Sequence, residues 1–136
     1  MKLLGISLFI LLFACSKDNE SRIPEVYVNF HAPLTDPRLS HLNGAGGAVV
    51  IDGYGVAGII IYRRADNAYV AFDRCSSVNP EKQCAVVPDD PSLTATDPCS
   101  GAKFSLFDGN PVKAPAKRPL KEYQVNVSNY EISVIN

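Results

Sequence analysis

The stretch Asp97-Pro-Cys-Ser-Gly-Ala-Lys-Phe104 carries a cysteine and ends in Ala102-Lys103-Phe104, in which apolar and polar residues alternate. The segment Tyr69-Val-Ala-Phe-Asp-Arg-Cys75 precedes it, and an Asp108-Gly109 pair typical of a tight turn follows it. Residues 74–102, between the two β-like segments, contain prolines and cysteines but no regular apolar spacing. The sequence therefore predicts an irregular but structured excursion between two β segments.

The rest of the chain also has a β pattern. Val26, Val28 and Phe30 alternate with polar residues, as in a half-buried strand. The apolar run from Gly58 to Arg63 predicts a strand that is buried on both faces. Further strands are expected at residues 48–51, 69–73, 103–106, 120–127 and 130–135. Because no apolar segment after the first fourteen residues has helical spacing, we expect an all-β fold.

The N-terminal residues have the pattern of an export signal. Lys2 provides a positive charge, and the following run, Leu3 to Phe13, is entirely apolar. The run is too short to cross a bilayer, which takes about 20 residues. It ends in Ala14-Cys15, a small residue before the cysteine that accepts the lipid in bacterial lipoproteins. The sequence therefore predicts a lipoprotein with Cys15 as its acylated N-terminus.

This interpretation divides the chain into a signal peptide (1–14), a lipidated tether (15–24) and one β domain (25–136). It also predicts a location in the bacterial cell envelope, as an outer membrane lipoprotein on either the periplasmic or the surface face. The formal net charge of −1 gives no indication of nucleic-acid binding. The expected partners are membrane lipid, through the acylated Cys15, and an envelope protein.

Three cysteines remain once Cys15 carries the lipid. Cys75, Cys84 and Cys99 would lie in an oxidising compartment, where two of them are expected to form a disulfide. No Cys-x-x-Cys motif is present and few basic residues lie nearby, so a structural bond is favoured over a redox-active dithiol. The residues alone leave the pairing open.

Four segments, in this order, resemble a Rieske iron–sulfur domain. Such a domain has an aliphatic strand before C-x-H, then C-P-x-H-G-x-x-F, a D-G turn and a proline loop of the form G-P-A-x-x-P-L. The matching residues are 69–75, 97–104, 108–112 and 114–123. The resemblance covers about residues 25–136 and implies antiparallel sheets in a small sandwich or barrel with an inserted loop subdomain.

The chain is most similar to small Rieske-like lipoproteins, which also carry a D-P-x-x-S-x-L-N segment. Here this segment is residues 36–43, and it predicts a short helix with Asp36 as N-cap and Pro37 at the first position.

The cluster ligands implied by the resemblance are mostly absent. A Rieske centre binds one iron through two thiolates and the other through two imidazoles. The first cysteine falls on Cys75, but the other positions fall on Ser77, Asp97 and Ser100. A serine hydroxyl is a weak ligand for such iron. We therefore expect no cofactor and no metal, although a cluster with an atypical set of thiolates and Asp97 stays an alternative.

Many Rieske domains join their two ligand loops by a disulfide. The resemblance places Cys99 at one of these positions and implies Cys84 as its partner. The first loop is longer here than in the family, so a Cys75–Cys99 bond stays open as an alternative.

The sequence predicts a binding or structural module and not an enzyme. Ser76, Ser77 and Ser100 have no histidine base nearby in the sequence, and no spacing of acids matches a calcium loop. The alternatives are a 2Fe–2S electron-transfer protein with an atypical ligand set and a thiol-redox protein. A basic run is interpreted as a solvated face, with lipid headgroups or an acidic partner as possible contacts; it consists of Lys113, Lys117, Arg118 and Lys121.

Overall fold

The computed structural model describes residues 22–136. The predicted signal peptide, the acylated Cys15 and most of the predicted tether lie outside these residues. Within the described part, no helix is long and apolar enough to cross a membrane.

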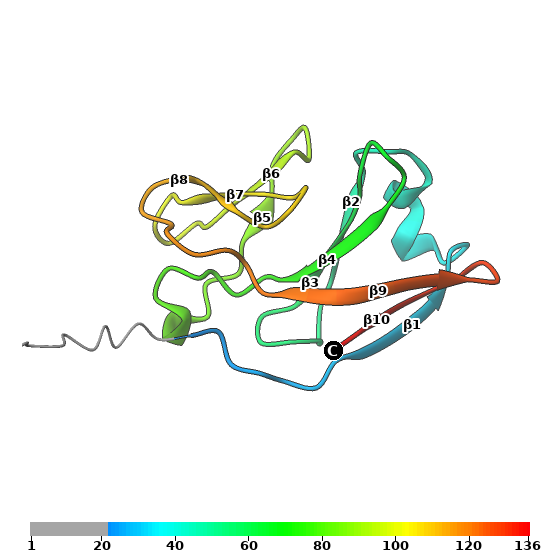
Figure 1. Cartoon of the computed structure of the whole chain (residues 1–136), viewed down its shortest axis with the longest axis horizontal. Coiled ribbons are helices and arrows are strands. Elements are labelled where there is room, and N and C mark those ends of the chain that lie inside the picture. Colours follow the sequence, from blue (N-terminus) through cyan, green and yellow to red (C-terminus); the bar gives the residue numbers. More distant parts are fainter. Residues whose placement is uncertain (1–21) are drawn as a thin grey trace, which may run out of the picture.

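The larger of two sheets has six antiparallel strands in the order β1-β10-β9-β4-β3-β2. Their bounds are Asn29–Pro33 (β1), Ala48–Ile51 (β2), Ile59–Arg63 (β3), Tyr69–Asp73 (β4), Glu122–Ser128 (β9) and Glu131–Ile135 (β10). Strands β4 and β9 pair only through Ala71 with Tyr123 and Phe72 with Glu122. The sheet curls at this narrow junction, so that β2-β3-β4 and β9-β10-β1 form two walls (Figure 1).

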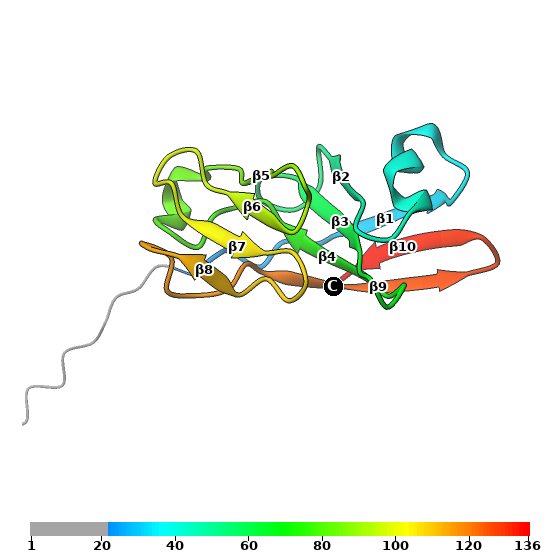
Figure 2. The ribbon, with the colours of Figure 1, turned by 90° about the horizontal axis from the view of Figure 1, so that it is seen from above.

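The smaller sheet has four antiparallel strands in the order β5-β6-β7-β8. Their bounds are Val87–Pro88 (β5), Thr94–Thr96 (β6), Lys103–Ser105 (β7) and Pro111–Lys113 (β8). This sheet is inserted between β4 and β9 and lies at one end of the molecule, whereas the turn between β9 and β10 lies at the other (Figure 2).

Strand β3 separates two apolar cores, which explains its isoleucine run. Ile59 and Ile61 face the core inside the larger sheet, whereas Ile60 and Tyr62 face the core beneath the smaller sheet. Phe72 on β4 and Phe104 on β7 belong to the second core. Burying both faces of β3 requires apolar residues at successive positions, as the sequence predicted.

A short 3-10 helix, η1 (Pro37–Asn43), connects β1 to β2. It begins where the Asp36 side chain accepts a hydrogen bond from the backbone N–H of Arg38 at 2.9 Å. Leu39 and Leu42 bury its inner face. The predicted cap and the position of Pro37 are confirmed.

The structure differs from the expected elements in three places. The excursion over residues 74–102 is more regular than predicted, because it contains β5, β6 and a second 3-10 helix, η2 (Pro80–Lys82). Strand β8 was not expected. Strand β1 begins at Asn29 rather than near Val26, since the N–H of Val28 donates to the Asn136 side chain instead of a strand partner.

Candidate functional site

Two loops at the junction of the sheets carry the residues that the sequence resemblance assigned to Rieske ligand positions. The first loop follows β4 and includes Cys75, which forms an isolated β-bridge with Ala85. The second loop joins β6 to β7. The backbone N–H of Ser76 donates to the Cys84 carbonyl at 2.9 Å, which closes the first loop on itself.

Asp97 connects the two loops. Its side chain is fully buried, and its carboxylate accepts hydrogen bonds from the Ser76 hydroxyl at 2.7 Å, the Ser100 hydroxyl at 2.7 Å and the Cys99 N–H at 2.8 Å. Burial alone would raise the pKa of Asp97, but the bonds from Ser100, Ser76 and Cys99 outweigh it and leave the pKa below its ordinary value. Asp97 is therefore a carboxylate at neutral pH whose oxygens already have donors.

Ser77 and Ser100, which the resemblance aligned with the two histidine ligands, also have partners. The Ser77 hydroxyl donates to the backbone carbonyl of Arg118 at 2.7 Å, which connects the first loop to the proline loop. The Ser100 hydroxyl, besides its bond to Asp97, accepts from the Ala102 N–H at 3.2 Å. Both hydroxyls therefore serve the internal structure of the loops.

Cys75 is a buried free thiol. Its sulfur donates to the Pro80 carbonyl at 3.5 Å, and it has no disulfide partner. Burial, together with the negative charges of Asp73, Asp97 and Glu81, raises the pKa of Cys75 to about 11. At neutral pH the group is therefore a protonated thiol, which is a poor nucleophile.

The other two cysteines join the loops covalently. The structure contains the Cys84–Cys99 disulfide, with Cα atoms 6.3 Å apart, and not the Cys75–Cys99 alternative. The sulfurs of Cys84 and Cys99 and the Asp97 carboxylate lie within 4.8 Å of one another. Because the two sulfurs are bonded to each other, this group offers no thiolate to a metal ion.

The residues at these positions do not fit a Rieske cluster. Such a cluster needs two imidazoles, and the two histidines, His31 on β1 and His41 on η1, lie away from the loops (Figure 1). His31 contacts Asn29 and Glu131, and both histidines are exposed. They are therefore surface residues, and the donor set at the loops is one buried thiol, two hydroxyls and one occupied carboxylate.

A second buried carboxylate, which the sequence analysis did not single out, lies at the start of the first loop and binds its backbone. Asp73 ends β4 and accepts hydrogen bonds from the Tyr123 hydroxyl at 2.7 Å, the Cys75 N–H at 2.8 Å and the Val56 N–H at 2.6 Å. Burial, followed by this bond to Asp73, raises the pKa of Tyr123. The sequence contains one sign of this contact, because position 55 is a glycine. An added Cβ there would lie 2.4 Å from an Asp73 oxygen.

The glycine of the Asp108-Gly109 turn is also required for steric reasons. Gly109 has a φ of +78°, and a Cβ there would lie 2.7 Å from the ring of Phe72. The glycine therefore allows the turn after β7 to pack on the core beneath the smaller sheet.

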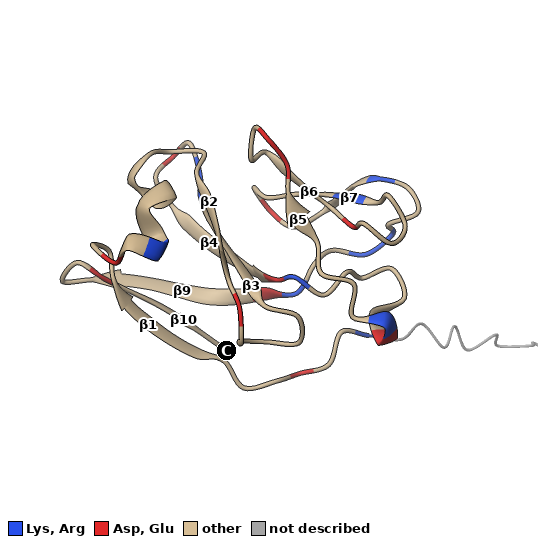
Figure 3. Ribbon diagram, turned by 180° about the vertical axis from the view of Figure 1, so that it is seen from behind, with Lys and Arg blue, Asp and Glu red and all other residues tan. Residues whose placement is uncertain are grey.

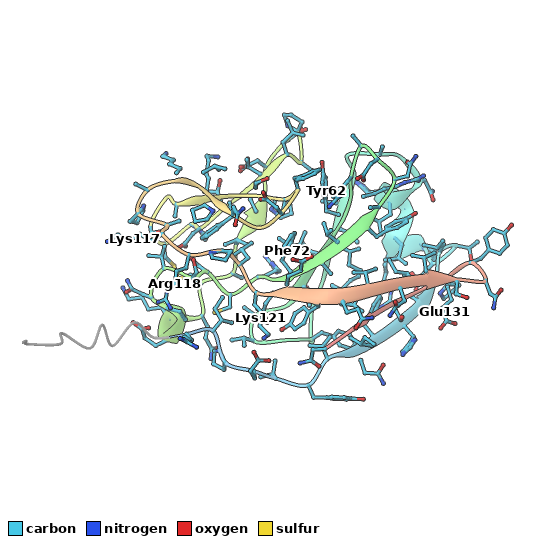
Figure 4. All side chains as sticks on the ribbon, in the orientation of Figure 1. Tyr62, Phe72, Lys117, Arg118, Lys121 and Glu131 are labelled. Atoms are coloured by element: carbon cyan, nitrogen blue, oxygen red, sulfur yellow. A yellow bond between two sulfur atoms is a disulfide. The ribbon has the colours of Figure 1, made fainter. Side chains whose placement is uncertain are left out.

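Several of the remaining charged candidates form pairs within the domain. Asp89 accepts from Thr94, Thr96 and Lys103, which fixes the turn between β5 and β6. Lys121 pairs with Glu25 and so does not belong to the solvated basic face. Figure 4 shows Lys117 and Arg118 at the end of the molecule that carries the smaller sheet, opposite Glu131.

Comparison with known proteins establishes the fold. No family model matches the sequence, and no curated protein matches it. Among solved structures, the plasma membrane Rieske protein PetC3 of the cyanobacterium Synechocystis PCC 6803 is similar with a TM-score of 0.59 at 20% identity, over 82% of this chain and 100% of that chain. The ferredoxin of carbazole 1,9a-dioxygenase from Nocardioides aromaticivorans IC177 is similar with a TM-score of 0.52 at 22% identity, over 82% and 98% of the two chains.

A chain from the complex of reduced oxygenase and oxidized ferredoxin in carbazole 1,9a-dioxygenase gives a TM-score of 0.52 at 19% identity, over 80% of this chain and 99% of that one. The predicted fold is therefore confirmed: residues 22–136 have a Rieske-like, all-β fold.

Proposed function

We propose that this chain, with its Rieske-like fold, is a membrane-anchored lipoprotein of the bacterial cell envelope that holds no 2Fe–2S cluster. In this proposal the domain is a binding or structural module, and its two former ligand loops are held together by protein contacts alone.

The hydrogen bonding of Asp97 is the observation that carries this proposal. Its carboxylate accepts hydroxyl or N–H donors from both loops, at distances of 2.7 to 2.8 Å. A carboxylate that is fully buried and has three donors is a stable structural element, and removing it for a metal would leave those donors unsatisfied. The Cys84–Cys99 disulfide adds a second connection between the same loops.

A thiol-redox function has less support. A reactive cysteine needs an accessible thiolate, whereas Cys75 is fully buried with its pKa raised to about 11. The other two cysteines of residues 22–136 are joined to each other, and His31 contacts Asn29 and Glu131 instead. This arrangement favours a structural role for all three.

The anchor part of the proposal is supported by the sequence before the described domain. A positive residue, a short apolar run and Ala14-Cys15 form a lipoprotein signal. One acyl chain gives only marginal membrane binding, and several chains are needed for stable attachment. A lipidated Cys15 carrying more than one chain would hold the domain at the membrane surface.

A comparison with a restored ligand set tests the loss of the cluster. The triple variant Ser77→His, Asp97→Cys, Ser100→His recreates two thiolates and two imidazoles at the family positions. Both proteins would be reconstituted with iron and sulfide under anaerobic conditions, reduced with dithionite and examined by electron paramagnetic resonance. We expect a Rieske-type signal from the folded variant and none from the wild type.

The competing function is an electron carrier with an atypical ligand set, favoured by the ferredoxins among the structural neighbours. A cluster signal from the reconstituted wild type would support this function and contradict ours. Circular dichroism of the triple variant checks that it is folded, and a single Ser77→His variant provides a second folded control.

A further inference from the structure

We infer that one end of the domain rests on the membrane and that its unpaired lysines contact the phosphate groups of anionic phospholipids. This surface, the basic end, consists of Lys82 on η2 together with Lys113 and Lys117 around the proline loop. The inference rests on the proposed anchor at Cys15, because the anchor brings this end of the domain to a bilayer.

The first observation is where the described chain begins. The described chain begins at the end of the molecule that carries η2 and β8, and two perpendicular views agree on this (Figures 1 and 2). Residues 15 and 22 are seven positions apart in the sequence. A fully extended chain spans at most about 3.6 Å per residue, so Arg22 lies within about 25 Å of an anchored Cys15.

The second observation is how the positive charges are distributed. Other cations have acidic partners: Arg38 pairs with Asp36, Arg64 with Asp66, Arg74 with Asp52, Lys103 with Asp89 and Lys121 with Glu25. Arg63 instead donates to two backbone carbonyls. Lys82, Lys113 and Lys117 are exposed, and no carboxylate within residues 22–136 forms an ion pair with them.

These unpaired lysines gather on one end although the net charge is −1. Figure 3 shows blue segments at η2, where a red segment adjoins them, and along the chain around β7 and β8, at the end where the described chain begins. Figure 4 places Lys117 at the same end. A basic surface beside an anchored N-terminus is complementary to anionic headgroups, whose attraction acts within a Debye length of the bilayer.

The geometry also orients the domain. With the basic end on the membrane, the turn between β9 and β10 points away from it, because this turn lies at the opposite end of the long axis (Figure 1). The unpaired lysines therefore fix an orientation that a tether alone would leave free.

Vesicle binding without the lipid tests this surface. The mature chain from residue 15 with Cys15→Ser has no acylation site and retains all the described residues. It would be sedimented with vesicles of phosphatidylcholine alone and with vesicles that contain phosphatidylglycerol. We expect binding only to the second kind, lost in high salt, since exposed charges are screened.

Two variants with the same change in net charge make the test specific. Lys113→Gln/Lys117→Gln removes two charges from the basic end and is expected to weaken binding at least tenfold. Gln124→Glu/Asn126→Asp adds two negative charges at exposed positions on β9 and is expected to change binding less than threefold. Equal loss in both variants, or no preference for phosphatidylglycerol, would overturn the inference.

The anchor is tested separately by incorporation of labelled fatty acid into the wild-type chain. If the wild type is labelled but the Cys15→Ser protein shows no preference for phosphatidylglycerol, the inference is overturned and the anchor stands. Absence of label overturns the anchor, and with it the inference, whatever the vesicle result.

Discussion

Asp97, which the sequence comparison aligned with a cluster cysteine of Rieske domains, joins two loops through its side chain. In a cluster, iron bridges the loops; here one carboxylate does so through the hydroxyls of Ser76 and Ser100 and the N–H of Cys99. The substitution by an acid was visible in the sequence, but its role was not. Which donors face a carboxylate depends on loop conformation, and the sequence of an irregular loop does not determine this.

Replacing Asp97 by Asn should destabilise the domain by about 2 to 3 kcal/mol, because charge-assisted bonds weaken and an amide N–H₂ would face donors in a buried position. The measurement is urea unfolding at pH 7. Asp89→Asn is the matched control: Asp89 also binds two hydroxyls and a cation but is partly exposed, so its loss should cost less. An unchanged midpoint for Asp97→Asn would contradict the role given to Asp97.

The same pair of proteins should show a defined pH dependence. The pKa of Asp97 in the folded protein lies below its ordinary value of 3.8, so ionisation of Asp97 stabilises the fold fully above about pH 4. The difference in free energy of unfolding between wild type and Asp97→Asn should therefore shrink as the pH falls below 3.8 through the folded pKa. Urea titrations between about pH 7 and pH 2.5 measure it, and a difference that grows on acidification would contradict this account.

At the scale of elements, the strands with simple apolar patterns were predictable, among them β7 of the inserted sheet, whereas the other three strands of that sheet were not. The run of isoleucines over Ile59–Arg63 predicted a strand with two buried faces, and the structure has a core on each side of it. Strands β5, β6 and β8 have only two or three residues, so they contain too little periodicity to be recognised. Their pairing depends on the turn fixed by Asp89 and on the disulfide.

The disulfide should be a main stabiliser of the inserted sheet. Cys84 and Cys99 are 15 residues apart in the sequence, and closing such a loop stabilises by about 3 kcal/mol in the chain-entropy model. We expect reductant to lower the urea midpoint of the wild type. Without reductant, the Cys84→Ala/Cys99→Ala variant should already have the low urea midpoint of the reduced wild type. Reductant should not change it further.

Cys75→Ala is the control for this experiment, since it removes the free thiol and leaves the bond in place. It should respond to reductant as the wild type does. Insensitivity of the wild type to reductant would show that Cys84 and Cys99 are not joined.

At the scale of the whole molecule, the residues that determine the fold differ from those that would determine its chemistry. The spacing of four segments predicted a Rieske-like fold, because turns such as Asp108-Gly109 are required by packing, whatever the loops bind. The ligands are not required by packing. The buried hydrogen bonds of Asp73 and the bond from Ser77 to the Arg118 carbonyl were not predictable, since they join segments distant in the sequence.

The anchor is a property of the whole chain and has its own prediction. Cells that express the chain with labelled palmitate should incorporate label into the wild type, and Cys15→Ala should abolish incorporation. The acylated wild-type protein should be found in the membrane fraction. Labelling that persists in Cys15→Ala would contradict acylation at that residue.

The iron content of the wild-type protein tests the central claim most directly. The mature protein would be purified under strictly anaerobic conditions from cells supplied with iron, and its iron, sulfide and visible absorbance would be measured against protein concentration. We predict a colourless protein with less than about 0.1 iron per chain, whereas a 2Fe–2S domain contains about two. A brown protein with about two irons and two sulfides per chain would contradict the account.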